Sequence, residues 1–111
     1  MGLIYTIDSA HSAFGSLLHG HTFRVEVYLE GKLKNGVVAG FDFRVVKEKV
    51  EKAVMTLNKR NLNDILKEPT VENIACYLIR NLKSLPIKSI RVWESTDRFA
   101  EVFREEALAE R

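Results

Sequence analysis

The chain has 111 residues, 46% of them apolar and 29% charged, and a net charge of +2. This predicts one globular domain, residues 1–111, and the interleaving of basic with acidic residues argues against a nucleic-acid partner. No apolar segment approaches the roughly 18 residues that span a membrane. The single cysteine, Cys76, and the lack of a signal-peptide pattern predict a cytoplasmic protein, with Cys76 as a small core residue.

The first half of the chain predicts two strands and a helix. Residues 2–14 alternate loosely and contain β-branched and aromatic residues, and residues 21–33 alternate more clearly, so both segments predict strands. An Asn-Gly turn at 35–36 leads into a short extended piece. Asp42 is a suitable N-cap, and the apolar residues that follow recur at helical spacing, which predicts a helix over about 43–57.

The second half predicts a helix and two strands. Residues 58–69 form a connection to a second helix, which Thr70 can cap and which ends near Leu82. Residues 87–95 and 98–105 predict strands, and the chain ends in a short or frayed helix. The order strand, strand, helix, helix, strand, strand predicts an α+β fold, with a four-stranded antiparallel sheet and both helices on one face.

The three histidines of the chain, His11, His19 and His21, lie close together in the sequence. Side chains two positions apart on a strand share a face, and antiparallel pairing can bring His11 beside the other two. Three neutral imidazoles are the ligands of an open zinc site, in which a fourth position is left for water or substrate. The alternative is a surface turn at His-Gly-His and a partly buried, polar His11.

Between residues 5 and 103, five motifs resemble the 6-pyruvoyl-tetrahydropterin synthase family, which includes the 6-carboxytetrahydropterin synthases. They are AHSAFGSLLHGHTFRVEVYLEG, GFDFRVVK, LNKRNLND, PTVENIA and VWES. The resemblance implies the tunnelling fold, whose subunits assemble into barrel rings, usually hexamers made of two trimers. It also implies that His11, His19 and His21 hold Zn²⁺. A homo-oligomer is expected in any case, because a small four-stranded sheet has two open edges.

The resemblance implies a zinc-dependent lyase that converts 7,8-dihydroneopterin triphosphate, or a related dihydropterin, by tautomerisation and elimination of the side-chain phosphates. Glu94 matches the glutamate that anchors the pterin, since one carboxylate accepts both N3–H and the 2-amino group. Thr70 and Glu72 match residues that line the same pocket. The alternatives are an exposed strand residue for Glu94, and helix capping for Thr70 and Glu72.

The chain departs from the family at the residues that usually transfer protons. Gly15, Asn58 and Lys59 replace the usual cysteine, aspartate and histidine. Lys59 is a candidate catalytic base if its pKa is depressed, and is otherwise a solvated loop residue or a contact to a substrate phosphate. The alternative function is therefore a zinc- and pterin-binding homologue that cleaves the side chain instead, or has little turnover. Further candidate bases, unranked by the sequence, are zinc-bound hydroxide, Asp8, Ser16, Asp97 and Glu101.

Overall fold

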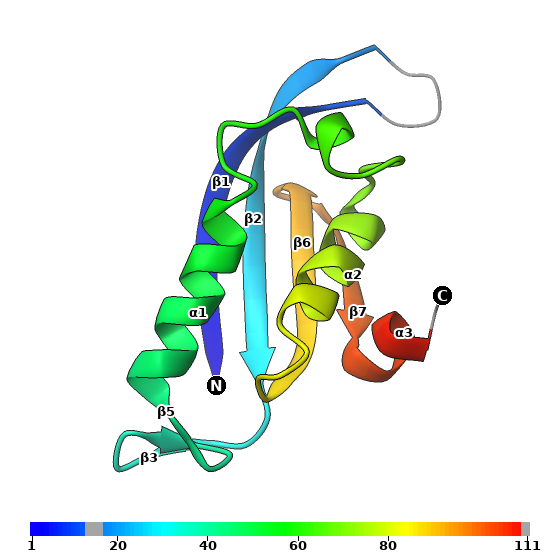
Figure 1. Cartoon of the computed structure of the whole chain (residues 1–111). Helices are drawn as coiled ribbons and strands as arrows, with labels where there is room; N and C mark the ends of the chain where they lie inside the picture. The colour runs from blue at the N-terminus through cyan, green and yellow to red at the C-terminus, as the bar shows by residue number, and fades with distance from the viewer. Residues whose placement is uncertain (13–16, 110–111) are drawn as a thin grey trace.

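The computed structural model describes residues 1–12 and 17–109, which form an antiparallel sheet in the order β1-β2-β6-β7. Helices α1 and α2 lie across one face of this sheet, and α3 follows β7 (Figure 1). The predicted four-stranded sheet with two helices on one face is confirmed. The elements are β1 (Gly2–His11), β2 (His19–Leu29), α1 (Phe43–Met55), α2 (Val71–Asn81), β6 (Ile87–Ser95), β7 (Arg98–Phe103) and α3 (Arg104–Ala109).

The segments between these elements hold structure that the sequence analysis missed. Three two-residue strands, β3 (Leu33–Lys34), β4 (Val37–Val38) and β5 (Phe41–Asp42), form a second sheet where only a turn and an extended piece were predicted. A 3-10 helix, η1 (Leu62–Asp64), interrupts the predicted connection. No helix in the described part of the chain is long and apolar enough to cross a membrane.

The predicted turn and helix caps are confirmed. Asn35 and Gly36 both adopt left-handed φ angles, 52° and 76°, as the turn of a tight hairpin requires. The Asp42 carboxylate accepts a hydrogen bond from the backbone N–H of Arg44, and α1 begins at the next residue after Asp42. This helix ends at Met55, two residues before the predicted end.

The core lies between the helices and the sheet. Alternate side chains of β2 face the helices and are at most 2% exposed, and they meet the apolar stripes of α1 and α2. Each such side chain stabilises the fold by roughly 1.5–3 kcal/mol when it is fully buried. Cys76 is buried, as predicted. The residues that meet are Phe23, Val25, Val27 and Leu29 of β2, Val46, Val50 and Val54 of α1, and Ile74, Leu78 and Ile79 of α2.

Strand pairing leaves one end of β1 and β2 extending past β6. The two strands pair along all of β1, from Gly2 opposite Tyr28 to His11 opposite His19. In contrast, the pairing of β2 with β6 stops where Arg24 lies opposite Trp93. The end of the β1–β2 ribbon therefore stands clear of the rest of the sheet, and this end carries the histidines (Figure 1).

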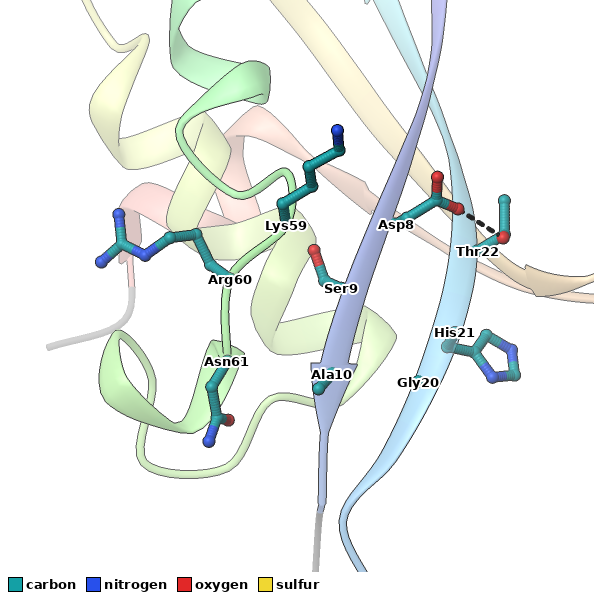
Figure 2. A pocket seen from close by; sticks show the side chains of 9 residues that line it. All are labelled: Asp8, Ser9, Ala10, Gly20, His21, Thr22, Lys59, Arg60 and Asn61. Carbon is teal, nitrogen blue, oxygen red and sulfur yellow. Dashed lines mark hydrogen bonds between the residues drawn. The ribbon is translucent and has the colours of Figure 1, made fainter.

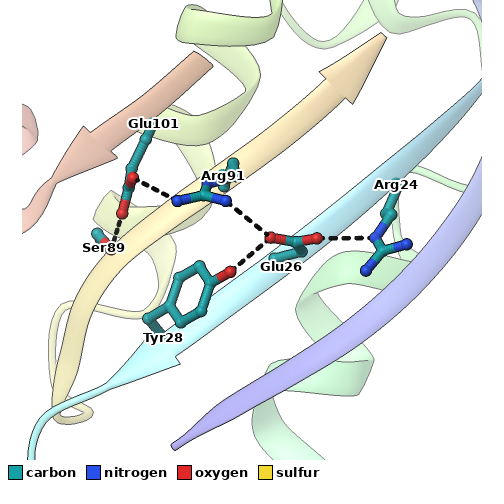
Figure 3. Close-up of polar contacts among 6 residues, drawn as sticks. All are labelled: Arg24, Glu26, Tyr28, Ser89, Arg91 and Glu101. Atoms are coloured by element: carbon teal, nitrogen blue, oxygen red, sulfur yellow. Dashed lines mark hydrogen bonds and ion pairs between the residues drawn. The ribbon is translucent and has the colours of Figure 1, made fainter. Parts of the chain in front are cut away.

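A chain of charged groups lies on the helix-free face of the sheet (Figure 3). At its centre the Glu26 side chain is only 5% exposed, 2.8 Å from Nε of Arg24 and 3.7 Å from the Arg91 guanidinium. Burial alone would raise the pKa of Glu26, but the hydrogen bond from Tyr28 and the charge of Arg24 hold it below its usual value. The folded state therefore favours the ionised form of Glu26.

Glu26 is expected to make the protein sensitive to acid. Because its pKa is lowered by folding, its contribution to stability is complete above the ordinary value of 4.5 and is lost as the pH falls through the folded-state pKa. We expect Glu26→Gln to lower the free energy of unfolding by about 2 kcal/mol at neutral pH. Urea titrations should also show a shallower loss of stability in this variant from about pH 5 to about pH 3.

Glu30→Gln is the matched control, because Glu30 is exposed and follows the same strand. It should leave the stability at neutral pH and its dependence on pH unchanged. Parallel pH profiles for the wild type and Glu26→Gln would show that the charge of Glu26 does not stabilise the fold.

Candidate metal centre

The structure brings the three predicted histidines together. His11 pairs with His19 across the β1–β2 ribbon, and His21 lies two residues further along β2 on the same face. Their ring centroids are 4.6–5.8 Å apart, and one ring nitrogen from each lies within 4.8 Å of the others. The predicted grouping is therefore present in the fold, and metal binding by it stays a prediction.

Backbone carbonyls orient two of the three rings. Nδ1 of His11 lies 2.9 Å from the carbonyl oxygen of Pro69, and Nδ1 of His19 lies 3.0 Å from that of Leu17. A carbonyl oxygen only accepts, so each Nδ1 carries the hydrogen and donates it. This leaves a lone pair on Nε2 of both residues, which is the form of histidine that binds a metal.

His21 has the opposite orientation. Its Nε2 donates to the carbonyl oxygen of Glu94 at the end of β6, which leaves Nδ1 as the atom with a free lone pair. Figure 2 shows the His21 ring projecting from β2 on the side away from residues 59–61. The bond to Glu94 joins β2 to β6 beyond the last regular pair between the two strands.

One buried nitrogen atom without a hydrogen-bond partner indicates that the site fits a metal ion. His11 is 4% exposed, and its Nε2 has no hydrogen-bond partner among the described residues. A buried polar atom without a partner is uncommon in folded proteins, and a coordinated cation would satisfy it. The ring of Phe23, 5.1 Å from that of His11 and 5.2 Å from that of His21, gives the cluster an apolar side.

Thr70 and Glu72 lie at the start of α2, next to the carbonyl that orients His11. The hydroxyl of Thr70 accepts a hydrogen bond from the backbone N–H of Asn73 at 3.2 Å, which confirms the capping interpretation for Thr70. Glu72 is exposed in the first turn of the same helix, where its charge suits the helix dipole. Contact of either residue with a substrate stays a prediction.

Glu94 lies where β6 separates from β2. It falls at an irregularity in the pairing with β7, between Trp93 and Ser95, and it is partly buried. Its carbonyl oxygen meets His21, so the predicted pterin anchor lies beside the histidine cluster. The structure thus places the predicted metal ligands and the predicted substrate ligand at the same end of the sheet.

Lys59 is not brought to the histidines within one chain. It is exposed on the far side of β1, and its amine points away from the ring of His21 (Figure 2). Asn58 has a structural role, because its side-chain oxygen accepts a hydrogen bond from the backbone N–H of Asp8 at 2.9 Å. A catalytic role for Lys59 stays a prediction, and Gly15 and Ser16 lie outside the described residues.

The carboxylates of the other candidate bases, Asp8, Asp97 and Glu101, already interact with neighbouring side chains. The carboxylate of Asp8 accepts a hydrogen bond from the hydroxyl of Thr22 at 2.6 Å, and that of Asp97 accepts one from Ser95 at 2.7 Å. The hydroxyl of Ser89 and the guanidinium of Arg91 hold the pKa of Glu101 below its usual range, and Glu101 lies in the network on the helix-free face.

Sequence reasoning missed the groups that orient the histidine rings. These are the backbone carbonyls of Leu17, Pro69 and Glu94. A carbonyl is present in every residue, so no residue type marks it in the sequence. Only the fold shows which carbonyls face the rings.

Comparison with solved structures identifies the fold. The fold matches that of 6-pyruvoyl tetrahydropterin synthase from Caenorhabditis elegans with a TM-score of 0.75 and 18% identity, covering 93% of each chain. It matches the Plasmodium vivax enzyme with a TM-score of 0.62 and 19% identity, covering 92% of this chain and 96% of that one. At these identities the matches show the fold alone, which is that of the tetrahydropterin synthases.

The sequence comparisons show the family. The family model for 6-pyruvoyl tetrahydropterin synthase matches residues 6–105, so the chain belongs to this family of pterin enzymes. A dihydroneopterin monophosphate aldolase from Pyrococcus furiosus is 42% identical over 85 residues, which cover 72% of this chain and 73% of that protein. A relative from Archaeoglobus fulgidus, provisionally assigned as a 6-carboxy-5,6,7,8-tetrahydropterin synthase, is 36% identical and covers 94% of this chain and 95% of its own.

Removal of the α2 cap should destabilise the fold measurably. We expect Thr70→Ala to lower the free energy of unfolding by about 1 kcal/mol, because one backbone N–H at the start of the helix loses its partner. Thr70→Ser keeps the hydroxyl and should retain most of this stability. Urea unfolding of the metal-free protein measures both variants, and equal losses in the two would contradict the capping role.

Proposed function

We propose that the chain is a zinc-dependent lyase that acts on the C6 side chain of a dihydropterin. The observation that carries this proposal is the set of three free ring nitrogens on His11, His19 and His21, each left by a carbonyl that holds the other nitrogen. Three histidine nitrogens with an open fourth position are typical of catalytic zinc. Zinc bound there would polarise the oxygen atoms of a coordinated side chain.

The reaction we favour is cleavage of the side chain between C1′ and C2′. The 42% identical relative is named as an aldolase, and this chain lacks the usual proton-transfer residues of the family. In the cleavage, a proton leaves the 2′-hydroxyl, the C1′–C2′ bond breaks, and its electron pair is delocalised into the C6=N5 bond of the pterin. A proton then adds to C1′. The products are a 6-hydroxymethyl-dihydropterin and glycolaldehyde or its phosphate.

This reaction requires one proton to be removed from the 2′-hydroxyl and one to be added to C1′, so a single acid–base group can carry out both transfers. Asn58 cannot act in this way, because an amide does not take up a proton near neutral pH. Lys59 is the candidate base from the sequence, and its exposed amine would have to meet a substrate from outside the histidine cluster.

The second candidate reaction is elimination of triphosphate from 7,8-dihydroneopterin triphosphate. The match of the 6-pyruvoyl tetrahydropterin synthase model across residues 6–105 supports it. It requires protons to move between carbon and oxygen, which is the work of the relay residues that Gly15, Asn58 and Lys59 replace here. The cleavage reaction is therefore preferred.

We assign pterin binding to Glu94, with Thr70 and Glu72 at the same site. The Glu94 carboxylate would accept the N3–H and the 2-amino group of the ring, both of which are donors on one edge. The backbone of Glu94 lies beside His21. This supports a binding mode in which the pterin ring contacts Glu94 while the substrate's side chain reaches the metal ligands.

We also propose that the protein is a homo-oligomer, a ring of subunits that forms a hexamer of two trimers. The outer strands of the four-stranded sheet are β1 and β7, and helices cover only one of its faces. Pairing of outer strands between subunits would remove these edges.

Zinc should bind to the three histidines and stabilise the fold. At a hundred times its Kd, Zn²⁺ should raise the free energy of unfolding by about 2.7 kcal/mol, because it binds the folded state. His19 is exposed, so His19→Ala removes a ligand without opening the core. This variant should melt like the metal-free wild type and should lose both zinc binding by calorimetry and the stabilisation by zinc. Full stabilisation of His19→Ala by zinc would contradict the site.

Product analysis tests the reaction. Zinc-loaded protein would be incubated anaerobically with 7,8-dihydroneopterin 3′-monophosphate and, separately, with the triphosphate, and the products followed by chromatography and mass. We expect a 6-hydroxymethyl-dihydropterin in the wild type and none with His19→Ala. A product that keeps all three side-chain carbons but has lost triphosphate would favour elimination. Unchanged substrates would exclude both reactions.

A further inference from the structure

Residues 58–63 run along the outer edge of β1, and Figure 2 shows part of this segment beside the strand. The backbone N–H of Lys59 donates to the carbonyl oxygen of Asp8 at 2.6 Å. Two residues further along the strand, the N–H of Ala10 donates to the carbonyl oxygen of Arg60 at 3.0 Å. Lys59 adopts a left-handed φ of 56° in this contact, which residues other than glycine rarely do. The segment is therefore docked on β1 firmly enough to offset one strained residue.

Asn63 ends this contact with two hydrogen bonds to the backbone of Ser12. Its side-chain oxygen accepts from the Ser12 N–H, and its side-chain nitrogen donates to the Ser12 carbonyl oxygen, both at 2.8 Å. Because one planar amide meets both backbone groups of one residue, it holds the position and the orientation of that residue. Asn61 holds Asn63 in turn, since its side chain accepts from the Asn63 N–H at 3.0 Å at the start of η1.

This pair of hydrogen bonds lies where strand pairing stops. The last pair of the β1–β2 ribbon joins His11 to His19, and Ser12 lies beyond it. Both residues that flank His11 are bonded to the docked segment, Ala10 through its N–H and Ser12 through Asn63. The backbone of His11 is thus held from both sides by residues 58–63.

A metal ligand at the end of a strand needs such support. A histidine nitrogen binds Zn²⁺ at about 2.0–2.1 Å, and a site tolerates departures of only about 0.2 Å. The carbonyl of Pro69 sets the direction of the His11 ring, but it does not set the position of the backbone that carries the ring. His21, in contrast, has a strand pair on either side of it along β2. The bonds of Asn63 to Ser12 supply for His11 what strand pairing supplies for His21.

We propose that Asn63 is a positioning residue of the metal centre, which fixes the backbone of His11 through Ser12 and so fixes the place of the His11 Nε2. The inference rests on the proposed function for the identity of the metal. Asn63 contributes no ligand atom, and its effect on the metal passes through the backbone of β1.

The test begins with Asn63→Ala in the full chain, which removes both bonds to Ser12. Asn63 is exposed, so the variant opens no cavity in the core. We expect the Kd for Zn²⁺, measured by calorimetry, to rise about tenfold, the lower end of what the loss of an outer support costs a metal site. Bound Co²⁺ should absorb less strongly in the visible, because loosely held ligands depart from the four-coordinate geometry.

Asn58→Ala is the matched control. It also removes a hydrogen bond between the docked segment and β1, but it does so at Asp8, three residues before His11. Both variants should lower the melting temperature of the metal-free protein, while only Asn63→Ala should change the Kd for Zn²⁺. The second control is Asn81→Ala, at an exposed asparagine at the end of α2. Both controls should bind Zn²⁺ within about twofold of the wild type.

An unchanged Kd in Asn63→Ala would overturn the proposal, as would equal rises in Asn63→Ala and Asn58→Ala, which would show a role in stability alone. If the wild type bound no Zn²⁺, the proposed function would fail, and the His11 ring of the metal-free protein would decide the role of Asn63. Long-range proton–nitrogen NMR spectra should then show the hydrogen of His11 on Nδ1 in the wild type and a mixture of both tautomers in Asn63→Ala. The same single tautomer in both proteins would overturn the positioning role.

Discussion

The pairing of β1 with β2 is the interaction on which the site depends. It runs the full length of β1 and sets His11 opposite His19, with His21 on the same face two residues along. A slip of one residue would turn every side chain of one strand to the other face and separate the histidines. The buried alternation of Phe23, Val25 and Val27 prevents such a slip, because it would move these side chains out of the core. The same apolar pattern thus specifies both the fold and the cluster.

The ends of other elements supply the carbonyl groups that orient two of the histidine rings. The chain entering α2 supplies the carbonyl of Pro69 to His11, and the end of β6 supplies that of Glu94 to His21. Each carbonyl holds one ring nitrogen and leaves the other free, which is how outer contacts tune a metal ligand. The Thr70 cap therefore acts on the site as well as on the helix, because it fixes the residue next to Pro69.

The two faces of the sheet have different chemistry. The helix side is apolar, and its residue Phe23 packs beside the buried ring of His11, while His19 is exposed. The other face carries alternating charges, with Arg91 between Glu26 and Glu101 and its guanidinium carbon 4.5 Å from the ring centre of Phe99. Of these charges Glu26 is the most buried, so removing one of its partners should cost the most stability.

The sequence by itself determined the four strands of the main sheet and the three α-helices, the Asp42 and Thr70 caps, the Asn-Gly turn and the histidine set, because each depends on neighbouring residues or on a local period. Only the tertiary structure decided which carbonyls orient the histidines, that residues 58–61 dock on β1, and that Lys59 lies away from His21. It also formed the small β3-β4-β5 sheet, whose two-residue strands are too short to show a period. These features are contacts between backbone groups or between distant segments, and such contacts leave no pattern in the order of side chains.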